Sequence, residues 1–377
     1  MNKQKLPGGW KEIELSEVFD FQKKSRIKAG EGLKKGEYKF FTSSDKQTKF
    51  IDQYNQYNQD GEYLIFATGG HAGIHYCNEK FSTSTDCFIV KVDKKVLAKY
   101  VYYYLFGKIQ LLEEGFKGAG LKHISKGYIQ DIKLFYPENK ETQKAIVSIL
   151  EKAEKAKEWR KEADNLTQDF LESTFFEMFG NPINNDKNWI KCNLSKYGLL
   201  ARGKSAHRPQ NAKFLYGGKY PFIQTGDVRQ SDSIYLKKYT QTYSEEGIKQ
   251  SKLFYRGTLA ITIAANIGET AVLAFDSYFP DSVVGFKVES PLFMSYLLKC
   301  YKPLLDSLAT NTAQKNINLA ILNNLEVIDI PIALQNKFAS IVQEVEKLKQ
   351  HQKRSNQEIN NLFNALMQKA FKGELKC

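Results

Sequence analysis

The chain has 377 residues, of which 42% are hydrophobic and 26% charged, with a formal charge of +13 and a pI of about 9.2. This composition supports packed cores, excludes wholesale disorder and favours a polyanionic partner, either nucleic acid or an anionic membrane surface. No run approaches the roughly 18 apolar residues of a membrane span, and residues 1–10 lack the apolar segment of a secretory signal. The five scattered cysteines indicate reduced thiols in a cytoplasmic protein.

The first 140 residues predict a globular domain. Short β-branched and aromatic runs separated by Gly, Asn and Asp are typical of strands, as at 62–67 and 87–92. A short helix is expected at 95–113. We therefore expect an α/β domain over residues 1–140, within the usual size range of domains.

Residues 141–180 predict one long helix. Apolar residues recur in steps of three and four, no Pro or Gly occurs over 141–178, and Gly180 with Pro182 terminates the pattern. The same organisation then returns. Residues 181–332 predict a second globular domain and residues 333–377 a second long helix.

The second domain carries strand patterns at 258–263 and 270–275 and a helical pattern at 291–308. The string Trp10–Ser16 is also similar to Trp189–Ser195, near the start of each globular domain. A unit of this length is a duplicated domain with its helix and not a solenoid repeat of roughly 20–50 residues.

The two helical runs are of similar length and opposite charge. Residues 141–180 hold six Lys and Arg against nine Asp and Glu (−3), and 332–375 hold seven against four (+3). Two separate surface helices are one possibility, but the matched stripes favour an antiparallel pair. The predicted pair interface comprises Ile146, Ala153, Leu166, Phe170, Ile341, Val345, Leu348, Ile359, Leu362 and Leu366. The predicted fold class is thus α/β (α+β), with two similar globular domains and two long antiparallel helices in a coiled coil with pseudo-two-fold repetition.

The charges of the helical runs cancel, so the whole excess of +13 lies on the remaining sequence. Basic and polar loop side chains recur there in both halves, and such groups suit phosphates and base edges. Surface solvation explains any one of them, whereas matching clusters favour DNA. The predicted contacts in the first half are Lys23, Lys24, Arg26, Thr42, Ser43, Ser44, Lys117, Lys122 and His123. Those in the second half are Arg202, Lys204, Arg208, Gln224, Thr225, Asp227, Arg229, Asn311, Gln314, Lys315 and Asn316.

Patterns for catalysis are weak. The segment Gly69–Gly73 lacks the spacing of a nucleotide loop and is better explained as a turn. A zinc site would need His71, His75, Cys77 and Cys87, whose spacing is not that of a finger or ribbon. No nucleophile elbow and no base-flipping tetrapeptide of the Asn-Pro-Pro-Tyr kind occurs. We expect no catalytic residue, no metal and no cofactor bound by this chain.

The layout resembles the specificity subunits of type I restriction–modification systems. The resemblance rests on the helical runs that begin Gln143–Ala153 and Gln335–Val342, and on their endings at Phe170–Gly180 and Leu366–Gly373. The string Asn311–Ile317 is also similar to this family, whereas Gly118–Ile124 departs from it in the first half.

The resemblance implies two target recognition domains, each reading one half of a bipartite, asymmetric site in double-stranded DNA, with the helix pair fixing the gap. It implies two methyltransferase subunits that carry S-adenosylmethionine, and two restriction/translocase subunits that use ATP and Mg. It implies a cytoplasmic, non-catalytic subunit without a membrane partner. Three alternatives stay open: a coiled-coil adaptor, a DNA enzyme with unrecognised motifs, and the specificity subunit of a methylation-only or methyltransferase–nuclease system.

Overall fold

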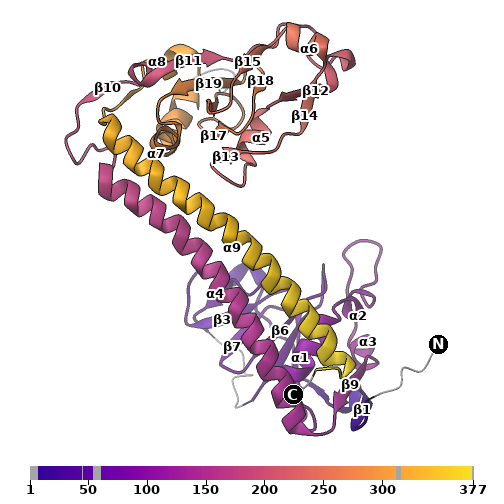
Figure 1. The fold of residues 1–377 in the computed structure, drawn as a ribbon. Helices are drawn as coiled ribbons and strands as arrows, with labels where there is room; N and C mark the ends of the chain where they lie inside the picture. Colours follow the sequence, from indigo (N-terminus) through magenta and orange to yellow (C-terminus); the bar gives the residue numbers. More distant parts are fainter. Residues whose placement is uncertain (1–6, 45, 54–60, 311–315, 376–377) are drawn as a thin grey trace. The chain divides into compact units, whose positions relative to one another are not determined.

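The computed structural model describes residues 7–44, 46–53, 61–310 and 316–375 (Figure 1). The chain divides into two compact units, residues 1–161 with 354–377, and residues 162–353. Both divisions fall inside the long helices α4 (Lys140–Phe179) and α9 (Ile332–Lys372). Each unit therefore contains a globular part and a segment of each long helix. The predicted division at 140, 180 and 332, which separates globular parts from helices, stays a prediction.

The described residues of the first unit form three small sheets. An antiparallel sheet has the order β2 (Phe19–Phe21), β8 (Cys87–Val92), β5 (Tyr63–Ala67), β6 (Ile74–Cys77). A second has the order β4 (Lys49–Ile51), β3 (Tyr38–Phe41), β7 (Phe81–Thr83), with β3 and β7 parallel. The third pairs β1 (Trp10–Glu14) with β9 (Lys133–Pro137). The helices of this globular part are η1 (Leu15–Glu17), η2 (Ala29–Glu31), α1 (Ala98–Gly107), α2 (Gln110–Glu113) and α3 (Lys126–Gln130).

The second unit repeats this plan with additional strands. Its largest sheet has the order β11 (Gly198–Arg202), β19 (Val283–Val288), β16 (Leu259–Thr262), β17 (Thr270–Leu273), β13 (Tyr235–Leu236). The next has the order β14 (Gln241–Tyr243), β12 (Tyr216–Phe222), β18 (Ser277–Phe279), β15 (Lys252–Phe254). The third pairs β10 (Lys191–Asn193) with β20 (Glu326–Ile328). The helices are η3 (Leu194–Tyr197), η4 (Lys213–Leu215), α5 (Thr225–Arg229), α6 (Glu245–Lys249), α7 (Pro291–Thr310) and α8 (Leu319–Asn323).

The two globular parts share one sheet plan, to which the second adds β13 and β15, and this common plan confirms the predicted duplication. In each, the first strand pairs antiparallel with the last and a 3-10 helix follows the first strand. Each also contains one parallel pair in its second sheet, β3 with β7 and β12 with β18. The strands predicted at 62–67, 87–92, 258–263 and 270–275 are confirmed as β5, β8, β16 and β17. The predicted helix at 291–308 is α7, whereas the one at 95–113 is divided into α1 and α2.

A buried glutamine marks the start of each long helix. The Gln143 amide donates to the Pro137 carbonyl at 2.8 Å and its Oε1 accepts the Leu97 backbone N–H at 2.9 Å. In the second unit the Gln335 amide donates to the Ile330 carbonyl at 2.7 Å. Because a buried carbonyl without a partner costs about 1–3 kcal/mol, each amide stabilises the join between the last strand and its helix.

Both long helices end at a glycine in the left-handed region, Gly180 with φ +72° and Gly373 with φ +74°. Glycine adopts this conformation without a Cβ clash and is favoured just after a helix. A Cβ at Gly180 would also lie 1.9 Å from Oδ1 of Asp186, which accepts the Asn181 N–H there. The predicted termination at Gly180 is confirmed.

The helices α4 and α9 lie side by side (Figure 1) and run antiparallel. In the second unit Thr167 contacts Gln352, and further along α4 Phe175 contacts Phe338, with ring centroids 5.3 Å apart. The residue numbers in α9 decrease as those in α4 increase, so the two helices run in opposite directions. In the first unit the Lys157 ammonium lies 4.5 Å from the ring centroid of Phe363. The predicted antiparallel helix pair is confirmed.

Candidate nucleic-acid interface

The basic loop after β2 carries Lys23, Lys24 and Arg26, all exposed. The Lys24 ammonium lies 4.7 Å from the centroid of the Phe88 ring, and Lys126 of α3 lies 5.5 Å from the same ring. The structure thus brings Lys126, which the sequence analysis missed, to the predicted basic loop. Only the fold places the N-terminus of α3 beside β8, so no local pattern marked it.

Two other polar segments of the first unit contact its main sheet. Ser44, in the loop that holds Thr42 and Ser43, accepts a 2.9 Å hydrogen bond at its carbonyl from Nε2 of His75. The turn 117–123 closes through a bridge between Lys117 and His123, and the His123 Nδ1 donates to the Thr68 carbonyl at 3.1 Å. Lys117, Lys122 and His123 are exposed on this turn, so the two ammonium groups and the second ring nitrogen of His123 are accessible to a ligand.

In the second unit the predicted basic residues lie at the end of β11 and in the loop that follows. The Arg202 Nε donates to the Asp281 carbonyl at 2.5 Å. The Arg208 Nη1 donates to the carbonyls of Ser205 at 2.6 Å and His207 at 2.9 Å. Lys204 is exposed, and its ammonium has no hydrogen bond or ion pair within the described chain. Arg208 therefore stabilises its own loop and Arg202 ties the end of β11 to the segment before β19, so Lys204 is the more available phosphate ligand.

The short helix α5 follows Gln224 and contains Thr225, Asp227 and Arg229. The prediction that Asp227 contacts DNA is not supported by its geometry. Its side chain is buried, and its two oxygens accept backbone N–H groups of Gln224 at 2.8 Å and Thr240 at 3.0 Å. This carboxylate holds two loops together. Thr225 is half-buried and Arg229 is exposed beside it.

The last predicted cluster is Asn311–Asn316. Asn311, Gln314 and Lys315 lie outside the described residues. Asn316 is described and forms a backbone bridge with Ala264, and the Ile317 N–H donates to the Ile263 carbonyl at 3.0 Å. The end of this string is therefore next to the main sheet of the second unit.

A hollow of about 490 Å³ opens beside α5 in the second unit. The lining residues are Gln210, Asn211, Lys213, Tyr216, Gly217, Gln224 and Gln241. We call it the amide hollow, because four of these side chains end in a carboxamide. Gln224 belongs to the predicted site, whereas the sequence analysis missed Gln210, Asn211, Lys213 and Gln241. Their convergence depends on the pairing of β12 with β14, which places Phe222 opposite Gln241.

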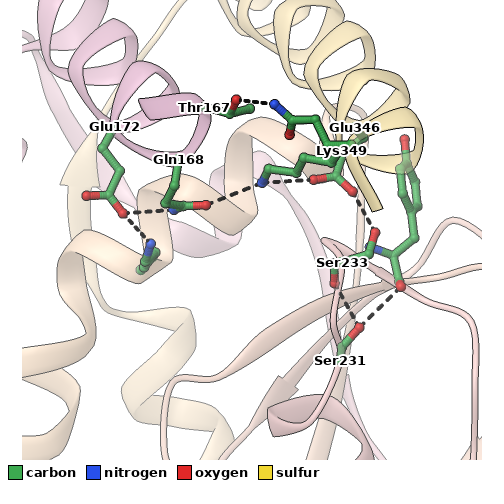
Figure 2. Close-up of polar contacts among 10 residues, drawn as sticks. Thr167, Gln168, Glu172, Ser231, Ser233, Glu346 and Lys349 are labelled. Carbon is green, nitrogen blue, oxygen red and sulfur yellow. Dashed lines mark hydrogen bonds and ion pairs between the residues drawn. The ribbon is translucent and has the colours of Figure 1, made fainter. Parts of the chain in front are cut away.

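The other end of the α5 segment is tied to α9. The Ser233 hydroxyl donates to Glu346 Oε2 at 2.6 Å, and the Ser231 hydroxyl donates to the Ser233 carbonyl at 2.8 Å (Figure 2). Two helical turns further along α9, the Lys353 ammonium donates to Asp232 at 2.6 Å, which lowers the pKa of that carboxyl group. The loop 231–235 is thereby held to one face of α9.

Polar contacts also connect α4, α7 and α9. The Gln352 amide donates to the Thr167 hydroxyl at 2.7 Å, and Lys349 contacts both Gln168 at 3.3 Å and Glu346 at 3.2 Å (Figure 2). In the same group Lys299 of α7 donates to Glu172 at 2.7 Å, and this hydrogen bond lowers the pKa of the Glu172 carboxyl group. The network surrounds a second hollow of about 460 Å³. The charged side chains of this network pair with one another. The network therefore positions α4, α7 and α9, and the hollow does not present an open ligand site.

The predicted helix-pair interface is partly wrong. Ile146, Ala153 and Val345 are buried in the cores, and Ile341, Ile359 and Leu366 are half-buried. By contrast, the side chains of four predicted residues are about half exposed or more, namely Leu166, Phe170, Leu348 and Leu362.

The physical reason is that polar residues occupy the buried face near the middle of the pair. Thr167 and Gln352 are 8% and 7% exposed and satisfy each other by their hydrogen bond. On α4 the buried positions are Thr167 and Leu171, one residue after the predicted Leu166 and Phe170, and they continue to Phe175. A stripe drawn only through apolar residues is therefore rotated from the true contact face.

The described residues show neither a membrane span nor a metal cluster. None of their helices is long and apolar enough to cross a membrane. No three His, Cys, Asp or Glu side chains among them gather closely enough to hold a metal ion. Of the four residues considered for zinc, Cys87 is buried against Ser84 and the Phe41 carbonyl, and His75 contacts Ser44.

Comparison with known proteins agrees with this architecture. The family model described as the type I restriction modification DNA specificity domain matches residues 7–167 and 198–361. The specificity subunit of the type I restriction enzyme EcoDI of Escherichia coli is 22% identical over 100% of this chain and 90% of its own length. A putative type I specificity subunit of Mycoplasma pneumoniae is 28% identical over 36% of this chain and 56% of its own.

Solved structures show the same fold. The type I S subunit from M. genitalium superposes with a TM-score of 0.63 at 15% identity, covering 97% of this chain and 98% of that one. A chain from a study of complex assembly and conformational transition of the type I R-M system gives 0.60 at 18% identity, covering 98% and 100%. With the family model matching both halves, the chain belongs to the DNA specificity subunits of type I restriction–modification systems.

Proposed function

We propose that each globular part of this subunit reads one half of a bipartite, asymmetric DNA site, and that α4 and α9 fix the gap between the halves. The observation that carries this proposal is the duplicated topology with different loops. Both globular parts repeat the same sheet plan, yet the second contains two further strands, β13 and β15, and the short helices α5 and α6, which the described part of the first does not contain. Equivalent frames with different loops suit two half-sites of different sequence.

The charge distribution supports a DNA partner. The positive excess lies outside the long helices, and exposed lysines such as Lys23, Lys122 and Lys204 occur in loops of both units. Lysine and arginine contacts to phosphates supply most of the sequence-independent affinity for DNA, whereas base-edge contacts supply the discrimination.

We further propose that the subunit is not itself catalytic and that its helix pair docks two methyltransferase subunits. Leu166 and Phe170 lie one turn apart on α4 and are 61% and 51% exposed, an apolar pair that a partner would remove from water. In this proposal the partners carry S-adenosylmethionine, and two restriction/translocase subunits that use ATP and Mg join them. The complex would act on double-stranded DNA in the cytoplasm.

The test is a genome-wide methylation map of the host strain with and without this gene. We expect one split motif with an adenine mark in each half to disappear on deletion and to return with the gene supplied in trans. If every methylated motif survives deletion in a strain that expresses the subunit and its methyltransferase, the proposal is wrong.

A further inference from the structure

We propose that the amide hollow of the second unit reads an adenine in the major groove, with Gln224 and Gln241 as the specificity-determining pair. This inference rests on the proposed function, since it assigns a base to one of the two reading parts. Three features of the hollow support it: the chemistry of the lining, the hydrogen bond between the two glutamines and the elements that carry them.

The lining chemistry selects the ligand class. Four carboxamides line the hollow, no acidic side chain does, and Lys213 provides its single cation among the described residues. Gln210, Asn211, Lys213 and Gln241 are exposed, so the hollow opens to solvent and can receive an edge carried on a larger molecule. Neutral amides with one flanking lysine suit a base edge next to a phosphate.

The two glutamines are joined to each other. The Gln224 Nε2 donates to the Gln241 Oε1 at 2.5 Å. Whichever way the two amides are turned, this bond uses one donor and one acceptor, so the pair still offers groups of both kinds. In the orientation observed, both amide hydrogens of Gln241 remain available. The side-chain amides of Gln210 and Asn211 form no hydrogen bond with the described part of the chain.

A mixed donor–acceptor surface discriminates between bases. Adenine presents N7 as an acceptor beside the N6 amino donor, which one carboxamide matches with two hydrogen bonds. Guanine presents two acceptors, N7 and O6, and is best matched by the two parallel donors of an arginine; no arginine lines the hollow, and its one lysine, Lys213, is assigned here to a flanking phosphate. Adenine is therefore the base that the lining fits.

The backbone that carries the two side chains is also held in place. Gln241 begins β14 and is opposite Phe222 of β12, while the Gln224 backbone N–H is fixed by Asp227 at 2.8 Å. Below them Phe222 and Tyr243 stack with ring centroids 4.0 Å apart. Prior positioning lowers the entropy that two long side chains lose when they bind, which increases discrimination.

The test is a methylation map of strains that express the full chain with its own methyltransferase, comparing wild type with Gln224→Ala and Gln241→Ala. We expect both variants to relax the preference for adenine at the same single position of one half-site, by about 5- to 150-fold. The matched control is Gln357→Ala, an exposed glutamine of α9 outside the hollow, which should keep the wild-type motif.

An isosteric variant keeps the test decisive if an alanine variant is too unstable to act. Gln241→Glu preserves shape but offers only acceptors, so the preference at that position should move from adenine toward cytosine, whose N4 is a donor. If the wild type gives a split motif and neither the alanine variants nor Gln241→Glu alter it, this inference is wrong while the proposed function stands. The absence of any split motif in the wild type would overturn it together with the proposed function.

Discussion

The Ser233 hydroxyl donates a 2.6 Å hydrogen bond to the Glu346 carboxylate, and this bond joins the segment after α5 to the long helix α9. Glu346 is only 6% exposed and also pairs with Lys349 at 3.2 Å. A buried carboxylate with two partners positions what it holds, because releasing either partner leaves a charge poorly solvated. The loop 231–235 therefore has a fixed relation to α9, and α5 with Gln224 precedes that loop directly.

Replacing Glu346 by alanine should loosen this segment. Hydrogen bonds to charged groups contribute about 1.5–3 kcal/mol, so the second unit should lose roughly that amount of stability and residues 231–235 should exchange their amide hydrogens faster. Hydrogen-exchange mass spectrometry measures both effects. The control is Glu344→Ala, an exposed residue of the same helix whose carboxylate pairs with Lys347, where about 0.5 kcal/mol or less is expected. Equal exchange in the two variants would contradict the positioning role.

The stability of the helix pair should depend on its buried side chains and not on the exposed apolar side chains of the predicted stripe. Phe338 is fully buried against Phe175 and Phe179, so Phe338→Ala should cost about 3–5 kcal/mol through reduced burial and the cavity that remains. Leu348 is 48% exposed, and Leu348→Ala should change stability by about 0.5 kcal/mol or less. Thermal or urea unfolding measures the difference. A larger effect at Leu348 than at Phe338 would show that the contact face has been assigned incorrectly.

The long helices could be predicted because the patterns that mark them are local. The duplication could be predicted because similar strings recur far along the chain. Steps of three and four, the missing Pro and Gly, and the stop at Gly180 mark α4 within one or two residues at each end. The sheet order could not be predicted. The strands are two to seven residues long, and pairings such as β12 with β18 join segments more than fifty residues apart.

The candidate site could likewise be predicted only in part. Gln224 and Arg229 belong to one contiguous polar string, so composition marks them. Gln241 lies in a different segment, and only the register of β14 on β12 brings it to Gln224. Asp227 lies in the same polar string and therefore resembles a DNA ligand. Its observed role depends on the backbone N–H of Thr240, thirteen residues away, which no sequence pattern reveals.

The salt dependence of DNA binding should distinguish phosphate ligands from structural cations. Lys204 is exposed and forms no ion pair in the described chain, so Lys204→Ala should weaken binding to all sequences similarly. It should also reduce the slope of log K against log salt by about 1, because one phosphate fewer is neutralised in the complex. Lys191 is the control, because its ammonium pairs with Glu326 at 2.9 Å. Binding of the full complex over a salt series measures the slope, and identical slopes for wild type and Lys204→Ala would remove Lys204 from the interface.

The exposed apolar pair of α4 should be needed for partner assembly and not for folding. Leu166 and Phe170 face water in this chain, so Leu166→Ser with Phe170→Ser should leave the melting temperature nearly unchanged. If a methyltransferase subunit covers them, the double variant should weaken its binding by about 30-fold or more, as expected for side chains that contribute at least about 2 kcal/mol at the centre of an interface. Isothermal titration with the purified methyltransferase subunit measures this affinity. Asp169→Ser, an exposed substitution between the two, should bind as the wild type does. Unchanged affinity in the double variant would place the methyltransferase on another face of the helices, whereas a large fall in melting temperature would show that these side chains support the fold.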